Sequence, residues 1–231
     1  MYFLQIINTL KDILFPIECV NCKKEKVWIC SDCLKKININ TFHVCPKCKK
    51  ETRKGEFCPG CQNNFILDRV LVAGNFQDPS LSKLVKIYKY NFAKEISQIL
   101  GEFLFLFLEK NNFHFKNAYL VPVPLHAKRL RFRGFNQSEE LAKVISEKTN
   151  ISLNTNLQRT KYSTPQSNLN RTQRLNNLQN CFSYQGENLQ QKNIILVDDV
   201  ATTNTTLNEC AKVLKKHGAN RVYGLVVASN D

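Results

Sequence analysis

The sequence predicts an α/β protein in which a parallel sheet is flanked by helices and preceded by a small cysteine-rich, metal-binding domain. Short apolar runs at residues 119–124 and 194–197 are each followed by a polar loop and then a helical pattern, the order typical of open parallel sheets. Eight cysteines in four C-x2-C pairs fall within residues 19–61. With 231 residues, 43% of them hydrophobic, the chain can bury the core of one such domain beside a small appendage.

The chain begins with a segment in which Phe3, Ile7, Leu10 and Leu14 recur at helical spacing. We therefore expect an amphipathic helix over residues 1–17. The segment lacks the basic leading region and small-residue cleavage site of a secretory signal. Binding to a membrane surface stays open, although packing against the rest of the protein is favoured. No apolar run is long enough to span a bilayer.

Residues 18–66 are expected to form a double zinc ribbon. Its four pairs are Cys19/Cys22, Cys30/Cys33, Cys45/Cys48 and Cys58/Cys61. Two sulfurs at this spacing lie on one tight turn, and two such turns complete a tetrahedral site for one Zn²⁺ ion. Disulfides are the alternative, but they need an oxidising compartment, and nothing in the sequence indicates export. Two structural zinc sites are therefore predicted.

The pairs can combine in two ways. Sequential pairing uses the first four cysteines for one ion and the last four for the other, whereas crossed pairing uses alternate pairs. We favour sequential pairing because shorter loops close at lower entropic cost. His43 lies beside Cys45, but two complete four-cysteine sets leave it no ligand role.

Residues 67–231 are expected to form the main domain. A first strand is predicted at residues 68–76, followed by a helix that begins at Asp78. A second helix at residues 99–108 is apolar nearly all round, so it should be buried. Residues 86–91 place basic and aromatic side chains together, which suits either a packed helix surface or a binding surface.

A basic loop is predicted at residues 126–137, between the strand at 119–124 and a helix at 139–148 with Ser138 as its N-cap. Guanidinium groups and backbone donors on such a loop would hold a pyrophosphate. A nucleic-acid backbone would use the same groups, and a solvated basic loop is the plainer alternative. The candidate residues are Lys128, Arg129, Arg131, Arg133, Gly134, Asn136 and Gln137.

An acidic and hydroxyl-rich loop follows the apolar run at residues 194–197. Ligands of open parallel sheets bind at the carboxyl ends of the strands, and a helix N-terminus favours phosphate. Two carboxylates beside them suit a polyhydroxyl group or a metal, so we predict a sugar-phosphate site. The alternative is a strand followed by a capped helix. The site residues are Asp198, Asp199, Val200, Ala201, Thr202, Thr203, Asn204, Thr205 and Thr206.

The remaining segments complete the expected domain. A helix at residues 207–217 should end at Gly218, before a last strand at 221–228. The polar stretch at residues 157–182 suits a hood over a ligand or a solvent-facing hairpin. Its candidate residues are Gln166, Arg171, Arg174 and Asn177, while Cys181 and Cys210 are expected to be packed.

The net charge of +14 favours polyanionic partners, namely nucleic acid, an anionic membrane surface or phosphorylated ligands. A solvated basic surface would give the same value. Charge alone therefore does not select one partner.

The stretch at residues 198–206, DDVATTNTT, resembles the phosphoribosyl pyrophosphate (PRPP) loop of type I phosphoribosyltransferases, V-D-D-V/L-x-T-T/S-G-x-T. One position departs, because Asn204 stands where glycine is usual. Asparagine tolerates positive φ better than most residues, so the loop can keep its shape. This resemblance implies a type I phosphoribosyltransferase-like sheet.

The whole chain resembles the ComF (ComFC-like) competence family. The resemblance rests on the four cysteine pairs, VPVPLHAKRLRFRGFNQSEELA at residues 121–142, QSNLNRTQRLNN at 166–177 and the PRPP-type loop, in that order. It implies PRPP binding with Mg²⁺. Asp198 and Asp199 would then meet the ribose hydroxyls, residues 202–206 the 5′-phosphate, and the basic loop through Gly134 the pyrophosphate. The residues named for the hood would lie above them.

Three functions follow from this resemblance. The first is a cytoplasmic competence protein that binds PRPP and handles incoming single-stranded DNA during natural transformation, in association with competence proteins at the inner membrane. The second is an active phosphoribosyltransferase of nucleotide metabolism or salvage. The third is a module that senses PRPP without turnover. The resemblance does not define an acceptor substrate or a catalytic residue.

Overall fold

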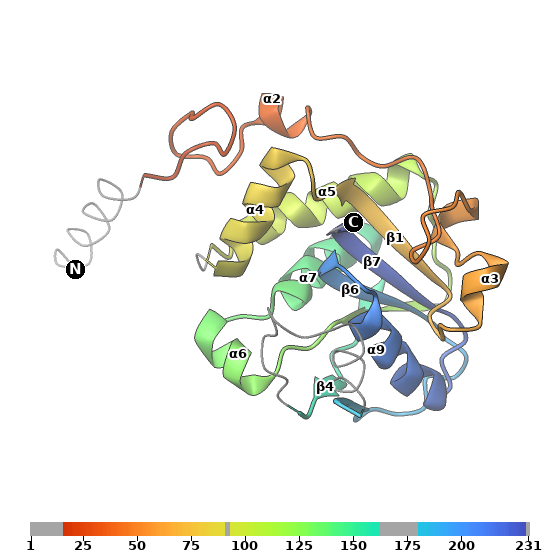
Figure 1. Cartoon of the computed structure of the whole chain (residues 1–231). Coiled ribbons are helices and arrows are strands. Elements are labelled where there is room, and N and C mark those ends of the chain that lie inside the picture. Colours follow the sequence, from red (N-terminus) through yellow and green to blue (C-terminus); the bar gives the residue numbers. More distant parts are fainter. Residues whose placement is uncertain (1–15, 91–92, 162–179, 230–231) are drawn as a thin grey trace.

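The computed structural model describes residues 16–90, 93–161 and 180–229. A parallel sheet of five strands, ordered β1-β7-β6-β2-β3, forms its centre, which confirms the predicted fold class (Figure 1). These strands are β1 (Arg69–Asn75), β2 (Ala118–Pro122), β3 (Ser152–Leu153), β6 (Asn193–Ala201) and β7 (Val222–Ser229). The helix expected at residues 1–17 lies outside the described residues, except for positions 16 and 17. The four candidate hood residues also lie outside them.

The central strand β6 is the apolar run that the sequence singled out. Residues 194–197 are completely buried, because β2 and β7 pair with β6 on either side and helices cover both faces. The strand continues to Ala201, beyond the predicted end at Val197. Asp198 and Asp199 are therefore strand residues and not members of a free loop, and Asp198 pairs with Val226 of β7.

Helices cover both faces of the sheet (Figure 1). One face packs against α5 and α7, with α4 beside them, around a core that includes Leu104, Leu141 and Ile195. The other face packs against α9 around Leu196 and Leu207. The bounds of these helices are α4 (Pro79–Tyr90), α5 (Ile96–Lys110), α7 (Gln137–Thr149) and α9 (Thr205–Lys216).

The basic loop predicted at residues 126–137 is partly wrong, because residues 127–133 form helix α6 (Ala127–Arg133). The side chain of His126 accepts a hydrogen bond from the backbone N–H of Lys128 and caps its start. Gly134 ends it with φ of 76°, a left-handed conformation that glycine adopts without strain. None of the residues of α6 is buried, so it lacks the apolar face by which sequence patterns reveal helices.

The next helix, α7, also begins earlier than predicted. Asn136, and not Ser138, is its N-cap: the Asn136 Oδ1 atom accepts a hydrogen bond of 3.2 Å from the backbone N–H of Ser138. The Asn136 Nδ2 atom donates to the carbonyl of Val123. The same asparagine thus caps α7 and ties it to the chain that leaves β2.

The cysteine-rich segment lies against both sides of the main domain. Val20, Ile29 and Ile37 of the first ribbon join the core on the α5 side, and Phe57 of the second ribbon joins the core on the α9 side. Its short helical turns are α2 (Ser31–Leu34), η1 (Arg53–Gly55) and α3 (Pro59–Gln62). The ribbons are therefore packed onto the sheet domain and not suspended beside it.

Two short antiparallel strands, β4 (Leu157–Arg159) and β5 (Phe182–Tyr184), flank the polar stretch. Cys181 and Cys210 are both buried, as predicted. Among the described residues, no helix is both long and apolar enough to cross a bilayer.

Candidate functional site

The eight paired cysteines form two four-sulfur groups that fit zinc. The sulfur atoms within each group lie within 4.8 Å of one another, and the groups are Cys19, Cys22, Cys30 and Cys33, and Cys45, Cys48, Cys58 and Cys61. Sequential pairing is therefore confirmed. A Zn–S bond of about 2.3 Å places neighbouring sulfurs roughly 3.8 Å apart, and the Cys22–Cys30 and Cys48–Cys58 sulfurs are 3.7 Å and 3.5 Å apart.

Local hydrogen bonds prepare the second site for metal. Burial acts to raise the pKa of the Cys45 thiol, but backbone hydrogen bonds from Cys48 and Cys58 outweigh it and lower that pKa to about 6. The thiolate is the form that binds metal. His43 takes no part in either group, since its Nε2 atom is hydrogen-bonded to the side chain of Asn111 at 3.1 Å.

The two aspartates at the end of β6 have different partners. The Ser138 hydroxyl, at the start of α7, donates a hydrogen bond of 2.9 Å to Asp198 Oδ1. The Nζ atom of Lys89, near the end of α4, lies 3.0 Å from Asp199 Oδ1. Both members of this ion pair are largely buried, with side-chain exposures of 22% for Lys89 and 9% for Asp199. The pair therefore joins α4 to the end of the central strand.

Burial and the neighbouring Asp199 charge raise the pKa of Asp198 to about 7, and Lys89 and Ser138 only partly counteract them. Burial lowers the pKa of Lys89, but Asp199 outweighs it, so the net shift is upward and the ammonium stays charged. The end of β6 thus carries a carboxyl group that changes its protonation close to neutral pH.

A cleft of about 240 Å³ opens at this end of the sheet. It brings the acidic pair together with cationic side chains from three other segments: Lys89 from α4, Arg129 and Arg133 from α6, and Arg159 from β4. Tyr90, Gln137, Ser138, Thr206 and residues 123–125 complete its wall. Acidic and basic groups thus face one space.

The basic wall of this cleft is ordered by its own contacts. Arg133 donates a hydrogen bond of 2.9 Å to Gln137 Oε1, and its guanidinium lies 5.7 Å from the centre of the Tyr90 ring. Gln137 is 2% exposed, and within the described part of the chain its Nε2 atom has no hydrogen-bond partner. A buried donor of this kind in a cationic wall suits an anionic ligand.

The threonine-rich loop crosses from β6 to α9. Its Thr203 and Thr205 hydroxyls are 2.8 Å apart. Asn204 adopts φ of 58°, so the asparagine takes the left-handed conformation expected of the usual glycine. Its Nδ2 atom donates to the carbonyl of Pro46 at 3.1 Å, and this bond fastens the loop to the turn between Cys45 and Cys48.

The structure brings many, but not all, of the predicted residues to the cleft. Asp198, Asp199, Thr206, Arg129, Arg133 and Gln137 line it. Lys128 and Arg131 lie on the exposed side of α6, and Asn136 and Gly134 shape the ends of the two helices. Val200 and Ala201 end β6, while Asn204 lines a separate cavity.

The stretches at residues 86–91 and 157–182 include Lys89, Tyr90 and Arg159, but the sequence does not assign these three to the cleft. Nor does it predict the contact of Ser138 with Asp198. The local pattern at residues 86–91 does not show which of its basic and aromatic side chains face a ligand site. The buried Tyr88 hydroxyl donates to the carbonyl of Gln137 at 2.8 Å. This bond holds the end of α4 against α7 and brings Lys89 within reach of Asp199.

Three relatives match over most of the chain. Competence protein F from Haemophilus influenzae is 31% identical, covering 93% of this chain and 98% of that protein. Competence protein ComFC from Bacillus subtilis is 29% identical, and the match covers 82% of this chain and 79% of ComFC. DNA utilization protein YhgH from Escherichia coli K12 is 27% identical, covering 84% and 93% respectively.

A family model described as a double zinc ribbon domain matches residues 10–62. Among solved structures, a hypoxanthine phosphoribosyltransferase from Staphylococcus aureus aligns with 59% of this chain and 64% of its own, at 16% identity and a TM-score of 0.38. That likeness is too distant to support an argument about chemistry.

The fold and the cysteine groups define a double zinc ribbon joined to an α/β domain built on a parallel sheet. The chain belongs to the family of competence protein F and ComFC, because its match to the Haemophilus influenzae protein spans nearly the full length of both chains.

The zinc assignment predicts the effect of Cys45→Ser. Removing one of four thiolates should release the second ion, so the zinc content should fall from two ions to one per chain, while the site formed by Cys19 and its partners stays filled. Metal analysis of the purified variant by mass spectrometry measures this. A content that stays at two would contradict the assignment.

The raised pKa of Asp198 predicts a pH-dependent stability. Because the folded protein holds the proton more tightly than the unfolded chain, this stabilisation is present below about pH 4 and is lost as pH rises towards 7. The free energy of unfolding of the Asp198→Asn variant, relative to wild type, should rise by up to about 1.4 kcal/mol per pH unit between pH 5 and 7. Denaturant titrations of both proteins measure this, and a constant difference would contradict it.

Proposed function

We propose that this protein binds PRPP with Mg²⁺ in the cleft at the end of β6 and handles single-stranded DNA during natural transformation. The observation that carries the proposal is the meeting, in one cleft, of two aspartates with the basic residues of α6 beside the threonine loop. In this interpretation Asp198 and Asp199 meet the ribose hydroxyls and the loop at residues 202–206 takes the 5′-phosphate. Arg129 and Arg133 face the pyrophosphate.

The chemistry of the cleft supports this ligand. Carboxylates are ligands that Mg²⁺ prefers, and the ion usually binds through one or two of them together with substrate phosphates. The N-terminus of α9 offers free backbone donors for a phosphate. The unpartnered, buried Gln137 Nε2 atom suits a phosphate oxygen on the opposite wall.

The DNA part of the proposal rests on the names of the relatives and on the surface of α6. Two of those names refer to competence and one to DNA utilization. On α6, Phe132 is 71% exposed and Leu130 is 41% exposed, between Lys128, Arg129, Arg131 and Arg133. Aromatic rings interleaved with cations bind single strands by stacking on bases and pairing with phosphates. We infer a cytoplasmic role beside competence proteins at the inner membrane.

Turnover of PRPP to form a nucleotide is the second candidate. It is favoured because the basic residues of α6 and the threonine loop lie around the buried pair Asp198 and Asp199. These carboxyl groups could stabilise positive charge that develops on a ribose. Pyrophosphate release with a panel of bases and amines would support it. Saturable PRPP binding without release would favour a sensor instead.

Calorimetric titration of the zinc-loaded protein with PRPP and Mg²⁺ should show saturable binding. Asp198→Asn combined with Asp199→Asn should abolish it, because the ribose and metal contacts are lost. Arg129→Ala should weaken it by about tenfold or more, since a charge-assisted contact is worth about 1.5–3 kcal/mol.

Arg131→Ala is the matched control, because Arg131 lies on the same helix but does not line the cleft. Its affinity for PRPP should equal that of wild type. Wild-type affinity in the double aspartate variant, with zinc content unchanged, would refute the site.

Affinity for a single-stranded oligonucleotide should fall steeply with salt, because bound cations are released from the DNA. Arg131→Ala should reduce the salt slope by about one. Phe132→Ala should weaken binding by about fivefold or more, with little change in slope, because it removes stacking. Fluorescence anisotropy over a salt series measures both effects.

Leu106→Ala is the control for Phe132→Ala, since Leu106 is 49% exposed on α5, away from the basic helix. Its affinity for DNA should stay at the wild-type value. Equal losses in the two variants, or binding that does not depend on salt, would contradict a DNA surface on α6.

A further inference from the structure

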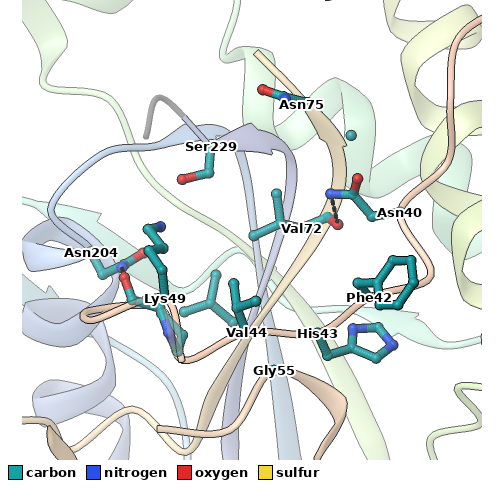
Figure 2. A pocket seen from close by; sticks show the side chains of 13 residues that line it. Asn40, Phe42, His43, Val44, Lys49, Gly55, Val72, Asn75, Asn204 and Ser229 are labelled. Atoms are coloured by element: carbon teal, nitrogen blue, oxygen red, sulfur yellow. Dashed lines mark hydrogen bonds between the residues drawn. The ribbon is translucent and has the colours of Figure 1, made fainter. Parts of the chain in front are cut away.

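A second cavity lies on the opposite side of the threonine loop from the PRPP cleft. It has a volume of about 230 Å³ and is enclosed by the segment that enters the second ribbon, by β1 and by Asn204 (Figure 2). At its upper end lie Asn75 and Ser229, the last residues of β1 and β7. It therefore opens at the same edge of the sheet as the cleft, where ligands of parallel sheets bind.

Asn204 gives this cavity an unsatisfied polar group. The residue is 7% exposed, and its Nδ2 atom is used by the Pro46 carbonyl. Its Oδ1 atom is buried and accepts no hydrogen bond from the described part of the chain. A 180° rotation of the Asn204 amide would not satisfy it, because Oδ1 would then face the Pro46 carbonyl oxygen and two acceptors would meet. Buried side-chain acceptors are rarely left unpaired in folded proteins, so a ligand with an N–H group fits here.

The rest of the wall combines aliphatic side chains with the polar side chains of Asn40, His43 and Lys49, which suits a flat ring that carries polar groups. Val44, Val70 and Val72 supply aliphatic surface, and Phe42, whose ring is 83% exposed, lies at the rim (Figure 2). The volume is below the roughly 300–1,000 Å³ of pockets for drug-sized ligands. A single heterocycle therefore fits better than a whole nucleotide.

We propose that this cavity binds a nucleobase, with a base N–H donating to Asn204 Oδ1, aliphatic side chains on the faces of the ring and Phe42 as a stacking surface. The proposal deepens the proposed function, since it rests on the neighbouring loop being the one that takes a sugar phosphate. The base comes either free in solution or as part of a single strand. Both sources present the same chemistry to the cavity.

Zinc has a structural part in this proposal. Pro46 lies between the ligands Cys45 and Cys48, and it both lines the cavity and holds the Asn204 amide. The second zinc site thereby fixes one wall of the base cavity and the start of the phosphate loop together. The zinc-loaded full chain is therefore the form to test.

The test titrates that chain with free adenine, hypoxanthine, cytosine and thymine. A second arm compares a short oligothymidylate with an abasic strand of equal length. Asn204→Gly removes the amide and suits the left-handed backbone at this position. Val44→Trp, at a half-exposed residue of the wall, fills the cavity. Asn150→Gly, at φ of 57° on the exposed end of α7, is the matched control.

We expect at least one free base, or the oligothymidylate in preference to the abasic strand, to bind the wild type. Asn204→Gly should weaken that binding by about tenfold, Val44→Trp should abolish it, and Asn150→Gly should not change it. Free bases bound alone identify a free base as the ligand, and preference for the base-bearing strand identifies DNA. Absence of both, or equal binding by wild type, Asn204→Gly and Val44→Trp, would overturn the proposal.

PRPP titration of the same proteins separates this inference from the proposed function. Val44 lines the base cavity and not the PRPP cleft, so Val44→Trp should keep PRPP affinity while losing the base. If the wild type binds a base in this cavity but no PRPP, the base site stands and the sugar-phosphate site fails. If it binds PRPP but no base, the sugar-phosphate site stands and the base site fails.

Discussion

The arrangement of the cleft depends on the pairing of β6 with β2 and β7. Because both neighbours are parallel to β6, the carboxyl ends of all three strands lie at the same edge of the sheet. The backbone N–H of Val123 still donates to the carbonyl of Val197, at 3.0 Å, just where the acidic pair begins. The chain leaving β2 is thereby held beside Asp198, and α6 and α7 follow from there with their cationic and polar groups.

A second constraint comes from Asn204. Its left-handed backbone turns the chain from β6 into α9, and its side chain fastens that turn to the zinc ribbon. A glycine would make the same turn, but it would make no contact with Pro46. The asparagine, which departs from the usual glycine, is thus compatible with the turn and adds a connection between the second cysteine group and the threonine-rich loop.

Much of this fold could be predicted because its signals are local. Cysteine spacing defined both zinc groups, and the run at residues 194–197 followed by two acids located the centre of the sheet. The helix α6 was missed because none of its residues is buried and it carries no apolar period. Lys89 and Arg159 were missed for a different reason: tertiary packing of α4 and β4, and not any pattern near them in sequence, directs them into the cleft.

The most direct measurement is a crystal structure of the zinc-loaded protein with PRPP and Mn²⁺, in which anomalous scattering locates the manganese. The account predicts manganese beside Asp198 and Asp199, the 5′-phosphate on the backbone at residues 202–206, and the pyrophosphate facing Arg129 and Arg133. PRPP and manganese bound outside this cleft, with the acidic pair still bonded to Ser138 and Lys89, would contradict it.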